Sequence, residues 1–99
     1  MAEVRLRPRA EDDLADIRKY TRDTWSETKA DAYVSALLDM MEALADRPNR
    51  GRSAEDFLAG AFKQKCRSHV IFYLKTSYGV EIIRVLHGRM DFAARLSGD

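Results

Sequence analysis

Two apolar runs joined by a short loop dominate the last third of the sequence. Residues 69–74 (HVIFYL) and 80–87 (VEIIRVLH) each have the length of a β-strand. The segment 75–79 between them contains a glycine, as hairpin loops commonly do. The first run is apolar on both faces, which predicts a central strand. Any fold of this chain must bury this hairpin, so the other elements are expected to cover it.

The N-terminal residues predict a strand followed by an amphipathic helix. Residues 4–7 alternate apolar and polar side chains, the pattern of a half-buried strand. Pro8 ends this strand and suits the first turn of a helix over residues 8–23. The apolar side chains of the helix recur at spacings of three and four: Leu14, Ile17, Tyr20 or Thr21, and then Trp25. The opposite face, expected to be solvated, consists of Asp13, Asp16, Arg18, Lys19 and Arg22.

A second helix is predicted to follow at once. Ser26 is a favourable N-cap, and Pro48 and Gly51 end the helical pattern. The pattern runs for about 20 residues, or close to 30 Å. Its apolar positions are Ala30, Tyr33, Val34, Leu37, Leu38, Met41, Leu44 and Ala45. With a tight corner at residues 24–26, the two helices are predicted to form an antiparallel hairpin.

The remaining segments complete a predicted α+β fold of the order β-α-α-β-β-β. Residues 49–60 are expected to be a loop with one helical turn at 55–58, and residues 61–67 a strand near the sheet edge with one basic face. Asp91 is expected to cap a last helical turn over residues 91–96. The N-terminal strand and the helical hairpin should pack on one face of a C-terminal antiparallel sheet. The other face is expected to stay partly open.

Composition limits the class of protein. A chain of 99 residues forms one domain, residues 1–99, and 45% apolar with 33% charged residues indicates a globular chain. A single cysteine and the lack of a signal-peptide core predict a cytoplasmic protein. No apolar run approaches the roughly 20 residues that span a bilayer. Residues 51–99 hold eight Lys/Arg and five Asp/Glu, an asymmetry too modest to indicate nucleic-acid binding by itself.

The sequence predicts neither a metal site nor a cofactor. One cysteine and two histidines lack the spacing of metal ligands, and no glycine-rich phosphate loop is present. Cys66 and His69 could form a nucleophile–base pair, but a small buried cysteine in a strand is far more common. Carboxylates at Asp12, Asp13 and Asp16 are explained by the positive end of a helix dipole.

Basic residues gather on and after the predicted sheet strands. The candidates are Lys63, Lys65, Arg67, Arg84, His87 and Arg89. Lysines that protect an edge strand from aggregation would explain Lys63 and Lys65. Arg84 is harder to explain because it interrupts an apolar strand, where a cation must reach the rim or find a partner. His87 could carry protons, although a structural role is the commoner one for a lone histidine.

Two segments resemble a known family. RLRPRAEDDLADIRKYTRDTW and RSHVIFYLKTSYGVEIIRVLHGRMD are similar to the ParE branch of the RelE/ParE toxins of bacterial toxin–antitoxin modules. The second segment carries the more specific similarity, at His69, Ile71, Phe72, Tyr73, Glu81, Ile82, Arg84, Val85, Leu86, His87, Arg89, Met90 and Asp91. The family's fold has the element order predicted above.

The resemblance implies partners. It implies a ParD-type antitoxin whose C-terminal segment wraps the toxin in a hetero-oligomer, with operator DNA bound only through the antitoxin. An amphipathic antitoxin segment would place apolar anchors against the helical hairpin, with charges setting partner choice. The candidate contacts are Leu14, Ile17, Arg18, Tyr20, Tyr33, Val34 and Leu37. Several of these residues are also needed for the core, so the two roles overlap.

The resemblance also implies two kinds of toxicity. ParE relatives poison DNA gyrase, whereas RelE relatives cleave mRNA on the ribosome. Cleavage requires a general base and cations for the charged transition state. The chain end offers no tyrosine or histidine of the RelE kind, so only His87 could replace it. We therefore predict gyrase inhibition with no catalytic residue and place the toxic surface on the basic residues above. The alternatives are a ribosome-dependent endoribonuclease and a non-toxic antitoxin-binding relative.

Overall fold

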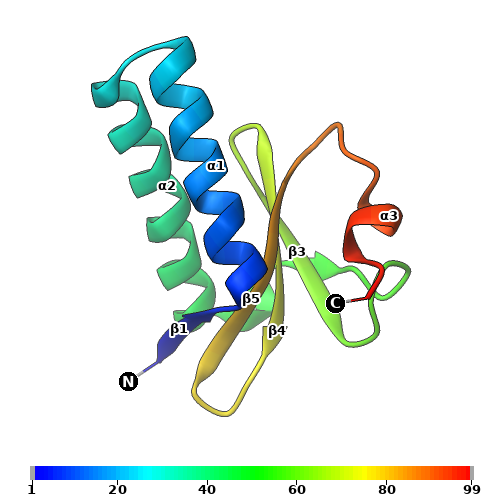
Figure 1. Cartoon of the computed structure of the whole chain (residues 1–99). Coiled ribbons are helices and arrows are strands. Elements are labelled where there is room, and N and C mark those ends of the chain that lie inside the picture. The colour runs from blue at the N-terminus through cyan, green and yellow to red at the C-terminus, as the bar shows by residue number, and fades with distance from the viewer. Residues whose placement is uncertain (1, 99) are drawn as a thin grey trace.

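The computed structural model describes residues 2–98, in which a five-stranded sheet has the order β1-β5-β4-β3-β2 (Figure 1). The strands are β1 (Glu3–Leu6), β2 (Arg52–Ser53), β3 (Ala61–Cys66), β4 (His69–Lys75) and β5 (Gly79–His87). β1 pairs with β5 in parallel, and the other neighbours are antiparallel. β4 is the middle strand, which confirms the prediction from its two apolar faces.

Two long helices form an antiparallel hairpin on one face of the sheet (Figure 1). They are α1 (Pro8–Thr24) and α2 (Glu27–Asp46), close to the predicted limits. Ser26 caps α2, since its hydroxyl accepts the Lys29 N–H at 3.1 Å. A short α3 (Phe92–Leu96) begins after Asp91, whose carboxylate accepts the Ala94 N–H at 3.2 Å. The predicted caps are therefore confirmed.

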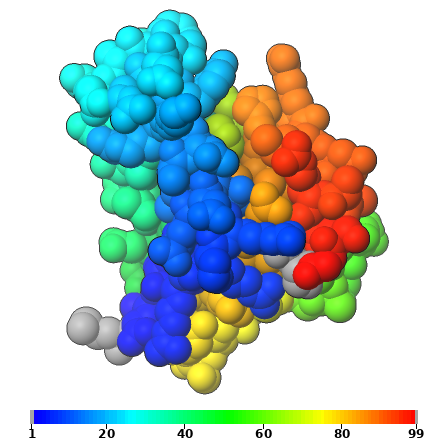
Figure 2. Space-filling model, viewed as in Figure 1, coloured from blue at the N-terminus to red at the C-terminus, as the bar shows by residue number. Residues whose placement is uncertain are grey.

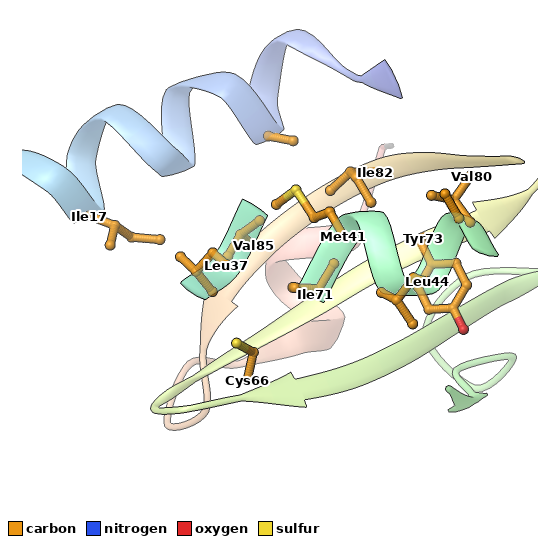
Figure 3. Close-up of a cluster of buried hydrophobic side chains, with 12 residues drawn as sticks. Ile17, Leu37, Met41, Leu44, Cys66, Ile71, Tyr73, Val80, Ile82 and Val85 are labelled. Carbon is orange, nitrogen blue, oxygen red and sulfur yellow. The ribbon is translucent and has the colours of Figure 1, made fainter. Parts of the chain in front are cut away.

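The first hydrophobic core lies between the helical hairpin and the sheet (Figure 3). Leu37, Met41 and Leu44 of α2 are completely buried against Ile71 and Ile82 of the central strands. Burying a side chain of this size contributes about 1.5–3 kcal/mol. The apolar face predicted for α2 is the face that packs on the sheet.

A second core covers the opposite face of the sheet, which was expected to stay partly open. Phe72 of β4 meets Phe57 and Phe92 edge to face, at ring-centroid distances of 6.4 and 5.0 Å. A bulge after Phe72 lets Ile83 turn to this face, and Leu96 anchors α3 there. The expectation of an open face was wrong because the loop and the C-terminal turn carry apolar residues that fold back over the sheet.

The connection between α2 and β3 is more regular than predicted. It contains a 3-10 turn, η1 (Pro48–Arg50), and the two-residue strand β2, which pairs with β3. A strand this short has no detectable alternation, so the predicted order omitted it. Arg67, expected at the end of the next strand, instead lies in the two-residue β3–β4 turn with φ of 55°.

The parallel pairing of β1 depends on Gly79. The Glu3 N–H donates to the Tyr78 carbonyl at 2.6 Å, so the β1 backbone passes close to the start of β5. Gly79 has φ of +144°, and a Cβ atom at this position would collide with the Glu3 backbone. Glycine is the residue that tolerates both conditions.

Candidate functional site

The basic residues predicted to form one toxic surface lie in separate places. Lys63 and Lys65 face the second core, since they pair across the sheet with Phe72 and Val70. Arg67 and His87 lie together at the end of the sheet near the tip of the helical hairpin. The structure therefore divides these four residues between one face of the sheet and one end of it.

Arg84 is held by Asp13 of α1. Its Nε and a terminal guanidinium nitrogen donate to the two Asp13 carboxylate oxygens at 2.8 Å each, and another terminal nitrogen donates to the Arg95 carbonyl at 3.0 Å. The two side chains are only 11% and 12% exposed. The partner that Arg84 required is thus Asp13, a residue expected on the solvated face of α1, and that expectation was wrong.

The position of Asp13 follows from where β1 stops. β1 ends beside Ile82, so the next part of β5 has no strand on this edge. Asp13 takes that place, since its carboxylate accepts the Val85 N–H at 2.9 Å. One carboxylate therefore satisfies a strand edge and neutralises a largely buried guanidinium.

A groove of about 450 Å³ opens at the tip of the helical hairpin. Figure 2 shows this hollow between the hairpin and the segment after β5, with the β3–β4 turn visible between them. We call it the aromatic groove, and the residues that line it include Tyr20, Trp25, Lys29, Tyr33, Arg67, His69 and His87. Its wall combines aromatic rings with cations, and no carboxylate from residues 2–98 lines it.

The apolar face predicted for α1 ended in Tyr20 or Thr21 and then Trp25. Tyr20 and Trp25 are instead 69% and 66% exposed. The tip of the hairpin extends beyond the end of the sheet (Figure 1), and this position leaves both rings largely exposed. Sequence analysis did not identify Trp25 and Lys29 as site residues. The sequence signal for this site was the presence of two large aromatic residues, Tyr20 and Trp25, close to the corner between the helices.

Tyr33 connects α2 to the β3–β4 turn. Its hydroxyl accepts the Ser68 N–H at 3.1 Å and lies 2.6 Å from Nδ1 of His69. Because the hydroxyl oxygen already accepts one proton, its own hydrogen is free to donate to Nδ1 of a neutral His69. Burial lowers the pKa of His69, and the nearby His87 lowers it further, whereas Asp13 acts in the opposite direction. These effects together favour the neutral imidazole.

His87 completes this end of the groove. Its ring lies 5.2 Å from the His69 ring, edge to face. Nδ1 of His87 accepts the Arg89 N–H at 3.1 Å, so a neutral His87 carries its proton on Nε2. In this tautomer Nε2 is a donor and the Nδ1 lone pair is already used, whereas a general base needs a free lone pair.

Cys66 is a structural residue. Its thiol is buried and donates to the Ala36 carbonyl at 3.7 Å. Burial raises the pKa of the thiol, although Arg67 opposes the shift, and His69 hydrogen-bonds to Tyr33. The arrangement does not favour the thiolate that nucleophilic chemistry requires.

The residues predicted to bind the antitoxin divide between core and surface. Ile17 and Leu37 are buried, and Leu14 packs partly buried against the same core. Val34 is also half-buried, and Arg18 forms ion pairs with Asp31 and Glu27. Tyr20 and Tyr33 line the aromatic groove and remain available for a partner.

Residues 2–98 hold neither a metal-binding cluster nor a membrane-spanning helix. In this part of the chain, no cluster of three or more histidine, cysteine or acidic side chains could hold a metal ion. Within the same range, no helix has the length and apolar character needed to cross a membrane.

The model of the family described as "ParE toxin of type II toxin-antitoxin system, parDE" matches residues 4–92. The chain belongs to the ParE toxin family. It is 38% identical to Toxin ParE1 of Caulobacter vibrioides over 96 residues, which are 97% of this chain and 99% of the relative. It is 34% identical to Toxin ParE1 of Mycobacterium tuberculosis over 87 residues, covering 87% and 89% of the two chains.

A solved structure supports the fold of this ParE toxin. The chromosomal ParDE system from P. aeruginosa aligns with a TM-score of 0.75 at 16% identity, over 88% of this chain and 96% of that one. The α+β fold predicted from sequence is confirmed, with β2 as an addition. Family membership makes the chain the toxin of a type II system and indicates an antitoxin as its partner.

Proposed function

We propose that this toxin inhibits DNA gyrase by binding it in the cytoplasm, and that a ParD-type antitoxin neutralises the toxin in a hetero-oligomer. The C-terminal segment of the antitoxin wraps the toxin, and operator DNA is bound through the antitoxin. This proposal extends the family assignment to a specific target and a specific type of partner.

The aromatic groove is the observation that carries the proposal. Tyr20 and Tyr33, predicted to contact the antitoxin, line the same groove as Arg67 and His87, predicted to contact the target. An antitoxin segment in the groove would cover target-binding residues by direct overlap. Neutralisation then requires no conformational change in the toxin.

The arrangement of the cations favours binding over catalysis. A ribonuclease must direct its cations and its base at one phosphate. Here Lys63 and Lys65 face the second core, and Asp13 neutralises Arg84. His87, the substitute base, uses its Nδ1 lone pair on the Arg89 N–H.

A supercoiling assay with purified gyrase tests the target. The wild-type toxin should block supercoiling, and Arg67→Ala should weaken the block because it removes an exposed cation that lines the groove. Lys75→Ala is the matched control, since Lys75 is an exposed cation at the opposite end of β4. Normal supercoiling at saturating wild-type toxin would refute the proposed target.

A growth assay separates the other functions. Induction of the toxin alone should stop growth and filament the cells, and co-expression of the antitoxin should restore growth. Codon-positioned cuts in translated mRNA, mapped by primer extension, would instead identify a ribonuclease. Unimpaired growth at good expression would identify a non-toxic relative.

A further inference from the structure

A second, more basic depression lies on the face of the sheet opposite the helical hairpin. This cleft has a volume of about 570 Å³, and the residues that carry the argument are Arg50, Arg52, Lys63, Lys65, Val70 and Phe92. We call it the basic cleft. Among the described residues, no carboxylate lines it, although the whole chain has a net charge of only +1. Its positive charge is therefore a local concentration.

Strand pairing brings these cations together. Arg52 of β2 is directly opposite Lys63 of β3, and such pairs have Cβ atoms about 5 Å apart. Lys65 follows on the same face of β3, two residues or about 6.6 Å along the strand. This interval is close to the separation of successive phosphates in a nucleic-acid strand.

The repulsion among these cations is not relieved within residues 2–98. Like charges directly opposite each other destabilise a sheet. In the described chain, no ion pair joins a carboxylate to any of the four cations of the cleft, Arg50, Arg52, Lys63 and Lys65. Lys63 Nζ lies 5.4 Å from the centre of the Phe57 ring, and the Glu55 carboxylate accepts the Gly60 N–H at 2.7 Å. A bound polyanion would remove the repulsion.

We propose that the basic cleft binds the phosphate backbone of duplex DNA. The cations follow the strands in a row, which suits successive phosphates along a backbone. Single-stranded nucleic acids instead require aromatic rings on which bases can stack. Phe92 is the aromatic residue of the cleft, and its ring packs edge to face with Phe57 and Phe72, at 5.6 and 5.0 Å. The cleft therefore offers charge without a free stacking surface.

The inference goes beyond the proposed function. Operator DNA is expected to be bound through the antitoxin, whereas this cleft gives the toxin its own contact with DNA. Binding by purified toxin is measured without gyrase, so the two proposals fail separately. Supercoiling inhibition by a toxin that does not bind DNA would overturn only the present inference.

The test is the salt dependence of binding to a short fluorescent DNA duplex, measured by anisotropy with the full-length toxin. Three or four neutralised phosphates give a slope of log K against log salt of roughly −3, between about 50 and 200 mM salt. Lys63→Gln and Lys65→Gln should each reduce the magnitude of the slope by about 1 and weaken binding several-fold at low salt. Lys63→Arg should retain both values.

Lys19→Gln is the matched control because it removes an exposed lysine of α1, on the other side of the molecule. It should leave affinity and slope unchanged. Lys63→Gln should also raise the unfolding midpoint slightly, because it relieves the repulsion with Arg52. This second readout separates lost charge from lost folding.

Three results would overturn the inference. The first is no binding by wild type at low salt, and the second is an equal loss for Lys19→Gln and Lys63→Gln. The third is equally tight binding of a single-stranded RNA of the same length, which would contradict the assignment to duplex DNA.

Discussion

Two contacts that join the helical hairpin to the sheet are built in different ways. At one, Asp13 of α1 holds Arg84 and the Val85 N–H of β5. At the other, Tyr33 of α2 holds the Ser68 N–H and His69 beside the β3–β4 turn. The first contact is charged and largely enclosed, whereas the second is neutral and forms part of the wall of the aromatic groove.

The comparison distinguishes a charge that stabilises the fold from a surface that is open to a partner. Arg84 has the cationic side chain expected of a toxic surface, but its charge is compensated inside the fold. The groove around Tyr33 exposes aromatic rings and Arg67 to solvent. We therefore expect substitutions at the first contact to change stability and those at the second to change binding as well.

Breaking the ion pair should have the largest effect. Asp13→Ala removes the carboxylate that binds the largely buried Arg84 guanidinium and accepts the Val85 N–H. Loss of one partner from such a pair costs about 3–5 kcal/mol. Urea unfolding should show this loss of stability, whereas Asp12→Ala, an exposed neighbour in α1, should stay within about 0.5 kcal/mol of wild type.

A double variant sharpens this prediction. Replacing both partners, as Asp13→Asn with Arg84→Met, removes the largely buried cation together with its carboxylate and should restore part of the stability. Equal stabilities for wild type and Asp13→Ala would mean that the pair contributes nothing. The charged contact would then not differ in strength from the neutral one.

A smaller effect is expected at the neutral contact. Tyr33→Phe removes the hydroxyl that bonds Ser68 and His69 and should cost about 1 kcal/mol. Water can replace part of the loss because this contact lies beside the groove. Thermal unfolding should show the change, and Tyr20→Phe, with an exposed ring, should show none. A cost as large as that of Asp13→Ala would contradict the distinction between the two contacts.

The sequence predicted most of the fold because its signals were local. The apolar repeat of α2, the Ser26 and Asp91 caps and the two-sided apolar run of β4 each specify an element without reference to the rest of the chain. β2 was not predicted because a strand of two residues is too short to show an alternation of apolar and polar side chains. The second core escaped because its apolar residues are scattered through a loop and a five-residue helix.

The candidate site was less predictable because it depends on distant pairings. Sequence analysis showed that Arg84 needed a partner, and it explained Asp13 by the helix dipole alone. Only the fold, which ends β1 beside Ile82, brings these two residues together. The aromatic groove likewise depends on how far the helical hairpin extends past the sheet, which periodicity cannot specify.

The smallest predicted effect is a pH dependence at the neutral contact. Burial lowers the pKa of His69 below its ordinary value of 6.5, and His87 lowers it further, although Asp13 opposes the shift. Tyr33 also donates to the neutral ring of His69. The folded protein therefore resists protonation of His69 more than the unfolded chain does.

The sign of the pH dependence follows from this difference. Between the lowered folded pKa and 6.5, the unfolded chain binds more protons, so the free energy of unfolding falls as pH falls through this window. The slope from one group stays below about 1.4 kcal/mol per pH unit. Urea unfolding from pH 7.5 downward should show the loss in wild type and a weaker dependence in His69→Gln. If the free energy of unfolding depended on pH as steeply in His69→Gln as in wild type, the dependence would come from other groups. The two contacts would then not differ in their response to pH.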